Sequence, residues 1–155
     1  MADQIEIEFL DDHHRLIPIV EKYFQSEWDE YYGSKGPDAA LNDIKFLCNK
    51  SKLPICLVAL RNGSFSGAIA LRHKSDSHKD LSPWLTSLFV VPEERRQGIG
   101  TRLLKTLEKL SLDFGYSKVF ARSATAVDFF MKNNWVPFDW LADGNLTIFS
   151  KNLKP

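Results

Sequence analysis

Residues 85–103 read LTSLFVVPEERRQGIGTRL and join an apolar stretch, a glycine turn and the start of a long amphipathic segment. The apolar stretch, 85–91, predicts a strand that is covered on both faces. After the turn, apolar residues recur at spacings of four, four, three and four, which predicts a helix that ends at Gly115. The residues of this stripe are Ile99, Leu103, Leu107, Leu110 and Phe114.

The turn between strand and helix has the features of a phosphate site. The first N–H groups of a helix lack an internal partner and carry partial positive charge. Gly98 and Gly100 let the backbone approach a ligand, while Arg95 and Arg96 add charge and fork geometry suited to phosphate. A plain tight turn with solvated arginines is the alternative, but the flanking strand and helix favour a diphosphate bound against residues 96–101.

Two other phosphate motifs do not fit this turn. A P-loop ends in Gly-Lys-Ser/Thr, whereas this turn continues as Gly100-Thr101-Arg102. A dinucleotide fingerprint needs a third glycine where this chain has Leu103.

Hydrophobic patterns and turn residues predict the other elements of an α/β fold with a mixed sheet. Asp11 or Asp12 is expected to cap a first helix that runs to about Trp28, and Pro18 implies that this helix starts late or is bent early. A second helix follows Asp38 and turns several apolar residues inward, Phe46 among them. The expected strands span 5–9, 55–60, 65–71, 85–91, 118–121, 135–141 and 146–149, and a short helix spans 126–130.

Composition narrows the function classes. The 155 residues predict a single domain, 1–155, and 20 Lys and Arg balance 20 Asp and Glu, so we expect no nucleic acid partner. No apolar run is long enough to cross a membrane. Cys48 and Cys56 lie in apolar surroundings without metal-site spacing, which predicts buried thiols, no metal site and a cytoplasmic location.

The chain resembles the GNAT acyltransferase superfamily. Residues 95–100 match its R/Q-x-x-G-x-G/A signature, and residues 126–135 resemble its later A-x-x-F-Y-x-x-x-G-F segment. The resemblance covers nearly the whole chain and is most specific over 84–135. It implies a GNAT-like, mixed, mostly antiparallel central sheet of about seven strands flanked by about four helices.

The resemblance implies acetyl-CoA as the cofactor. The backbone of residues 88–90 would pair with the pantetheine arm, and the amides of residues 96–101 would hold the pyrophosphate. Ser123 and Phe129 would lie along the arm. The expected cofactor-binding residues are Leu88, Phe89, Val90, Arg95, Arg96, Gln97, Gly98, Ile99, Gly100, Thr101, Ser123 and Phe129.

The chain departs from the family pattern at three places. Phe130 stands where the family usually has a tyrosine that is often assigned as general acid, so Ser123 or a water would supply that proton. Asn134 replaces a glycine, but Asn tolerates the left-handed backbone of a helix C-cap. Thr86 and Ser87 stand where the family often has a glutamate base.

The expected reaction is direct attack of a primary amine, on a small molecule or a polypeptide, on the thioester in a ternary complex. Glu27 is our candidate for the general base, alone or through water. Trp28, Glu30 and Tyr31 follow it and would line the acceptor side, because carboxylates and aromatic faces suit a cationic amine. A buried Trp28 with a solvated acidic rim is the plainer interpretation. Trp84 would frame the acceptor groove or belong to the core.

Other functions stay open at this point. The missing tyrosine and glutamate are also compatible with a non-catalytic acyl-CoA-binding module, a sensor or assembly subunit. A nucleotide binder is a weaker alternative. His73 and His78 are further candidate bases, although a polar stretch favours a surface role. A homodimer through the closing hairpin is compatible with the sequence, but no residue demands it.

Overall fold

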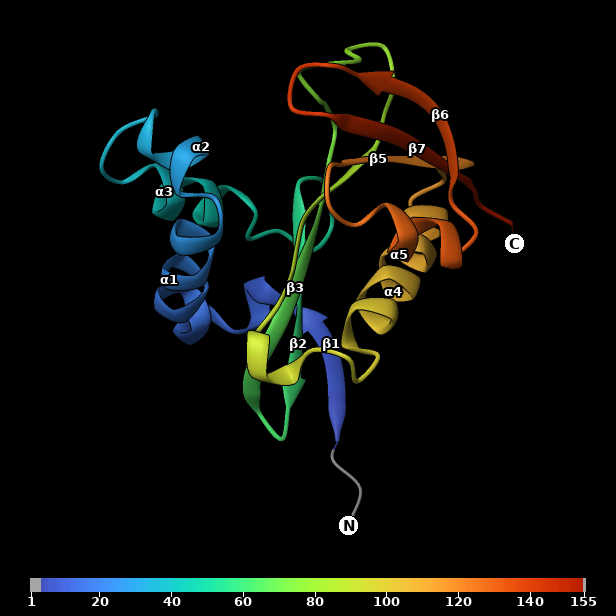
Figure 1. Ribbon diagram of the computed structural model, residues 1–155. Helices are drawn as coiled ribbons and strands as arrows, with labels where there is room; N and C mark the ends of the chain where they lie inside the picture. Colours follow the sequence, from blue (N-terminus) through green and yellow to red (C-terminus); the bar gives the residue numbers. More distant parts are fainter. Residues whose placement is uncertain (1–3, 155) are drawn as a thin grey trace.

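The computed structural model describes residues 4–154, and its strands form one seven-stranded sheet in the order β1-β2-β3-β4-β5-β7-β6 (Figure 1). Neighbouring strands are antiparallel except β4 and β5, which are parallel. This confirms the mixed sheet that the order of elements predicts and the mostly antiparallel pairing that the family resemblance implies. The strands are β1 (Ile5–Phe9), β2 (Ile55–Arg61), β3 (Ser64–Arg72), β4 (Trp84–Val90), β5 (Lys118–Ser123), β6 (Val136–Leu141) and β7 (Leu146–Asn152).

Helices cover both faces of the sheet, with α1, α2 and α3 on one side and α4 and α5 on the other (Figure 1). The described residues contain five α-helices, one more than predicted, because residues 29–33 form a short helix where we expected mostly loop. The helices are α1 (Ile17–Glu27), α2 (Asp29–Gly33), α3 (Ala39–Phe46), α4 (Ile99–Asp113) and α5 (Val127–Lys132). Short 3-10 turns are η1 (Leu10–Asp12), η2 (His14–Leu16) and η3 (Pro92–Glu94).

Local sequence explains most of these elements. Asn62 and Gly63 both have positive φ, 51° and 85°, as a tight hairpin turn between β2 and β3 requires. The apolar stripe of α4 is buried through Ile99, Leu103 and Leu107 against the sheet. Gly115, with φ of 93°, ends this helix as predicted.

Two helix predictions need correction. α1 begins at Ile17 with Pro18 in its first turn, so Asp11 and Asp12 lie in η1 and do not cap it. Phe46 is 64% exposed, and Ala40 and Ile44 form the buried side of α3 instead. Phe46 follows Ile44 by two residues, which is about 200° around the helix, so it lies on the side opposite the buried Ala40 and Ile44.

None of the helices in residues 4–154 is both long and apolar enough to cross a bilayer. Both cysteines are free thiols, with Cys56 fully buried and Cys48 half-buried. The single domain and the cytoplasmic location stay predictions.

Candidate functional site

β4 bulges and then separates from β5. Ala68 pairs with Phe89 and Ala70 with Thr86, so two residues of β4 face one residue of β3. Ser87, inside this bulge, has a φ of 56°. Within the described residues, β4 and β5 pair only at Trp84 and Phe120, which leaves the backbone of residues 88–90 without a β5 neighbour. A β-bulge commonly redirects a strand next to a functional site.

The turn before α4 presents a run of unpaired amides. Arg96 and Gly98 have positive φ, 65° and 82°, and Gly98 is the N-cap of α4 without a side-chain cap. In the described part of the chain, the N–H of Arg95 bonds to Pro92 and the next amide with a protein acceptor is that of Arg102, which bonds to Gly98. The amides of residues 96–101 are therefore free to bind an anion.

A cavity of ≈ 410 Å³ opens beside these amides. Its wall combines the end of α1, the separated half of β4, the glycine turn, the start of α4 and the start of α5. The lining residues are Glu27, Leu88, Phe89, Val90, Glu94, Arg95, Arg96, Gly98, Ile99, Gly100, Thr101, Ala126 and Phe129.

Arginine side chains shape both the wall and the turn. Arg95 donates from Nε to the Val90 carbonyl at 2.8 Å, and its guanidinium lies 5.7 Å from the centre of the Phe89 ring. From the end of β2, Arg61 donates to Glu94 and to the side-chain oxygen of Gln97, each at 2.5 Å. Arg61 thus ties the turn to the sheet, while Arg95 supplies positive charge at the cavity.

Most residues expected to bind the cofactor lie around this cavity. Gln97 does not line it, because its side chain bonds to Arg61. Ser123 does not line it either. Its Oγ accepts the Ala126 N–H at 2.8 Å in the turn before α5, and α5 itself has no side-chain cap, although we had expected Thr125 and Asp128 to form a capping box there.

The residues expected on the acceptor side are more dispersed. Glu27 lines the cavity, whereas Trp28 is half-buried between Phe24 and Phe89. Glu30 and Tyr31 lie on α2, are exposed and do not line the cavity. Trp84 is 1% exposed and donates its indole N–H to Leu81, so it belongs to the core.

The family's acid position is also part of the core. Phe130 is 3% exposed and its ring lies 5.2 Å from those of both Trp135 and Phe149. Asn134 adopts a φ of 67°, so it provides the left-handed turn that the family makes with glycine. The turn that ends α5 is therefore retained, whereas the position of the family's tyrosine holds a phenyl ring that packs in the core.

A half-buried polar network that joins α2, α3 and the sheet was missed by sequence reasoning. Arg72 donates to both oxygens of Asp43 at 2.9 Å and, from Nε, to the Thr86 hydroxyl at 2.8 Å. Tyr32 donates to Asp43 at 2.8 Å, and burial, followed by the nearby Asp43 carboxylate, raises the pKa of its hydroxyl. These residues come from α2, α3, β3 and β4, and no sequence spacing connects them. Thr86 is thus held by Arg72 at the position of the family's glutamate.

His78 is bonded at both ring nitrogens. Nδ1 lies 2.9 Å from the Ser77 hydroxyl and Nε2 lies 2.9 Å from Asp139. Its side chain is 18% exposed and its ring is close to those of Trp84 and Phe138. His78 is therefore not the plain surface residue that its polar stretch indicates, whereas His73 is exposed.

Comparisons with known proteins agree with this geometry. A family model described as "Acetyltransferase (GNAT) family" matches residues 17–134. No curated protein matches the sequence. The fold is similar to crystal structures of aminoglycoside 6'-acetyltransferase type Ii (TM-score 0.78, 20% identity, 98% of each chain) and of Ard1 from Thermoplasma volcanium (0.73, 21%, 100% of each chain). It is also similar to an aminoglycoside 6'-N-acetyltransferase complexed with coenzyme A (0.78, 17%, 98% of each chain). At these identities the structural matches show the fold.

Proposed function

Because the chain belongs to the acetyltransferase (GNAT) family, we propose that it transfers acetyl from acetyl-CoA to a primary amine by direct attack in a ternary complex. The observation that carries this proposal is the run of free amides at residues 96–101 beside the ≈ 410 Å³ cavity. It fits a diphosphate, because backbone N–H groups and a helix N-terminus both favour bound phosphate.

The residues of the cavity suggest how acetyl-CoA would be held. The amides of residues 96–101 and the guanidinium of Arg95 would bind the pyrophosphate. The backbone of Leu88 and Val90, on the side of β4 that has no β5 neighbour, would hold the pantetheine arm, with Phe129 packing beside it. Acetyl-CoA, when bound, supplies an activated acetyl group as a thioester. A Leu88 amide would donate to the carbonyl oxygen of that group.

Two side chains would handle protons. Glu27 is the carboxylate on the cavity wall from α1, and we propose that it takes the proton of the acceptor ammonium, directly or through water. Ser123 uses Oγ to accept the Ala126 N–H, which leaves its O–H available to donate. Trp28, Glu30 and Tyr31 would then border the route of the acceptor rather than the cavity itself.

The acceptor is proposed as a small-molecule or polypeptide amine. A mass-spectrometric assay with acetyl-CoA and pooled amines, aminoglycosides and peptide N-termini among them, tests this. A mass increase of one acetyl group on an amine is expected. Binding of acetyl-CoA without acetylation of any amine and without thioester hydrolysis would contradict it.

A non-catalytic acyl-CoA-binding module is the second candidate. Its support is that the family's acid position is the buried Phe130 and that Thr86, at the glutamate position, is bonded to Arg72. The same assay separates the two functions, because a module binds acetyl-CoA but acetylates nothing. Calorimetry with acetyl-CoA, CoA and ATP tests the nucleotide-binding alternative.

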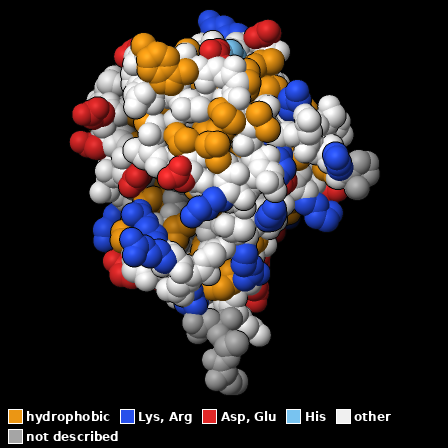
Figure 2. All heavy atoms as spheres, turned by 45° about the vertical axis from the view of Figure 1, so that its right-hand side comes forward, with side chains coloured by type: hydrophobic (Ala, Val, Ile, Leu, Met, Phe, Trp, Pro, Cys, Tyr) orange, Lys and Arg blue, Asp and Glu red, His pale blue; other side chains and the backbone are white. Residues whose placement is uncertain are grey.

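A homodimer and a cytoplasmic location also stay proposals. β6 is the last strand of the sheet, and Val136, Phe138 and Trp140 on it are exposed. Figure 2 shows hydrophobic side chains gathered on the upper part of the face where the β6–β7 hairpin lies. This edge would be the contact surface of a dimer, which analytical ultracentrifugation tests. The two free thiols support a reducing compartment.

A further inference from the structure

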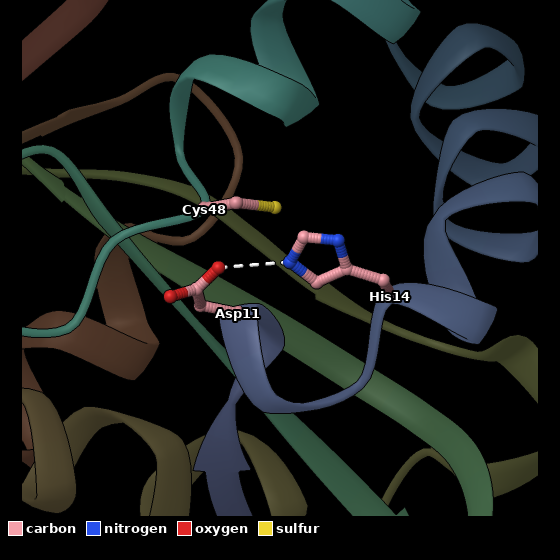
Figure 3. Close-up of side chains that lie close together, drawn as sticks. All are labelled: Asp11, His14 and Cys48. Atoms are coloured by element: carbon pink, nitrogen blue, oxygen red, sulfur yellow. Dashed lines mark hydrogen bonds and ion pairs between the residues drawn. The ribbon is translucent and has the colours of Figure 1, made fainter.

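Three side chains of types that commonly bind metal ions lie close together beside the start of α1 (Figure 3). One ligand atom of each of Asp11, His14 and Cys48 lies within 4.8 Å of the other two. His14 Nε2 is 2.8 Å from Asp11 Oδ1. None of the three lines the acetyl-CoA cavity. The cluster is therefore separate from the proposed active site.

The backbone around this cluster is held in place by other contacts. Lys50 Nζ lies 2.7 Å from Asp12 Oδ1, which ties the segment after α3 to η1. The side-chain amide of Asn49 donates to the carbonyls of Phe46 and Pro54 at 2.9 Å and 2.8 Å. These contacts fix the turn that carries Cys48 next to Asp11, and of the three potential ligands only the Cys48 thiol also bonds to the turn, donating to the Ile44 carbonyl at 3.4 Å.

The three ligand types are those of zinc sites. Zn²⁺ binds thiolate, imidazole and carboxylate, with bonds of about 2.0–2.3 Å in a tetrahedral arrangement. Ligand atoms around such an ion lie about 3.3–3.5 Å apart. The 2.8 Å N–O separation and the 4.8 Å limit for the cluster lie on either side of this value. Side-chain shifts on the order of 1 Å would bring the three ligands to an ion.

We propose that Asp11, His14 and Cys48 bind a divalent transition metal ion of the Zn²⁺ class, with solvent water as the fourth ligand. The His14 side chain is 62% exposed, so it is free to adjust and leaves one side of the ion open to water. On binding, the Cys48 sulfur exchanges its proton for a bond to the metal, and the proton leaves to solvent. The hydrogen bond between His14 and Asp11 is replaced by a bond from each residue to the ion.

A bound ion would link the start of α1 to the end of α3. These two helices pack against each other and against one face of the sheet, and Glu27 lies at the other end of α1. An ion that binds only the folded chain raises the free energy of unfolding. We therefore expect Zn²⁺ to raise the melting temperature of the protein.

The test is a titration of the full chain, free of any oligohistidine tag, with Co²⁺ followed by Zn²⁺. Co²⁺ should produce a near-ultraviolet thiolate-to-metal absorption band, which Zn²⁺ then removes. Cys48→Ala should abolish the band, and His14→Ala should weaken Co²⁺ binding at least tenfold. His73→Ala, which changes an exposed histidine outside the cluster, should leave binding unchanged.

Two results would overturn the site. One is the absence of a thiolate band with excess Co²⁺, and the other is a band that survives Cys48→Ala or a Co²⁺ affinity that is unchanged in His14→Ala. Because His14 is largely exposed, His14→Ala is informative even if Cys48→Ala impairs folding. Neither result affects the acetyl-transfer proposal, which rests on another part of the molecule.

Discussion

Gly98 and Gly100 stand two residues apart in the same turn, but different causes require a glycine at each. Gly98 has a φ of 82°, a left-handed conformation that other residues rarely adopt. At Gly100 an added Cβ would lie 3.5 Å from the Phe129 ring, an ordinary contact. The folded protein would therefore accept alanine at position 100. The remaining reason for glycine there is that a bound phosphate needs to come close to the backbone.

Gly100→Ala should separate folding from cofactor binding. The free energy of unfolding should stay the same or rise by up to about 1 kcal/mol, because alanine favours helix over glycine. The affinity for CoA should fall about tenfold, a loss of about 1.4 kcal/mol, because the methyl group enters the cavity. Urea unfolding and calorimetry measure the two effects. Gly33→Ala, in open space on α2, is the control, and equal CoA affinity in both variants would contradict the site.

Glu27→Gln tests the proposed base. The amide cannot take a proton, so kcat should fall about 100-fold or more while the KM for acetyl-CoA stays unchanged. Steady-state kinetics with an acceptor identified by mass spectrometry gives both values. Glu21→Gln changes the same helix away from this cavity and should have no effect. A Glu27→Gln variant with full kcat would remove Glu27 from the mechanism.

At the scale of elements, the glycine turn is supported by β2, not only by its own backbone. Arg61 bonds to Glu94 and Gln97, and the exposed fractions of the Arg61 and Glu94 side chains are 16% and 25%. A half-buried pair of this kind orients its partners better than an exposed one, which solvent screens. We therefore expect Arg61 to position the amides of residues 96–101.

Arg61→Ala should raise the KM for acetyl-CoA about three- to tenfold, a loss of about 1 kcal/mol, and leave kcat unchanged. Arg61→Lys should recover part of the affinity, since it keeps the charge but not the fork. Lys109→Ala removes an exposed pair with Asp113 on α4 and serves as the control. A fall in kcat with unchanged KM would show that Arg61 does not act through the turn.

The bulge of β4 depends on a close approach between two strands. A Cβ at Gly67 would lie 2.7 Å from the Phe89 carbonyl oxygen, and backbone atoms cannot turn aside as a side chain can. Gly67→Ala should therefore lower the free energy of unfolding by about 1–3 kcal/mol, as overpacking does, and weaken CoA binding by moving β4. Urea unfolding measures the first effect. Unchanged stability would mean that β4 moves freely relative to β3.

At the scale of the whole molecule, the features that could be predicted are those formed by residues close together in the sequence. Periodicity and turn residues predict the individual strands, the Asn62-Gly63 turn and α4, and the glycines predict the turn before α4. The separation of β4 from β5 depends on pairings between distant strands, so no short pattern contains it. The same holds for Arg61 with Glu94, for the Arg72 network and for Cys48 with His14, whose members lie tens of residues apart.

Tertiary packing decides the surroundings of several single residues. Trp84 belongs to the core, one of the two environments that the sequence left open, and Phe130, which cannot donate a proton, packs there as well. Phe46, which we had expected to face inward, is exposed on the side of α3 opposite Ile44. Each of these positions is compatible with two environments in sequence, and only the packing of several elements selects one.

The core also buries two weakly acidic side chains, a thiol and a phenol, and burial favours their protonated forms. Burial raises the pKa of the fully buried Cys56 thiol from 9.0 to about 12. Burial and then Asp43 raise the pKa of the Tyr32 hydroxyl above its ordinary value of 10.0. In the unfolded chain both groups return to their ordinary values. Above pH 9 the folded chain therefore binds more protons than the unfolded chain.

The free energy of unfolding should consequently be constant with respect to Cys56 below pH 9 and fall as the pH rises from 9 toward 12. Each such group contributes a slope of at most about 1.4 kcal/mol per pH unit, because stability falls with pH wherever the folded state holds the extra proton. Cys56→Ala removes one of these groups, so its stability should fall less steeply over the same interval. Urea unfolding at several pH values measures the slopes.

The slopes, rather than the stabilities at one pH, must be compared, because the smaller side chain also leaves a small cavity. Equal slopes for Cys56→Ala and the wild-type chain would show that the thiol ionises as easily in the core as in water.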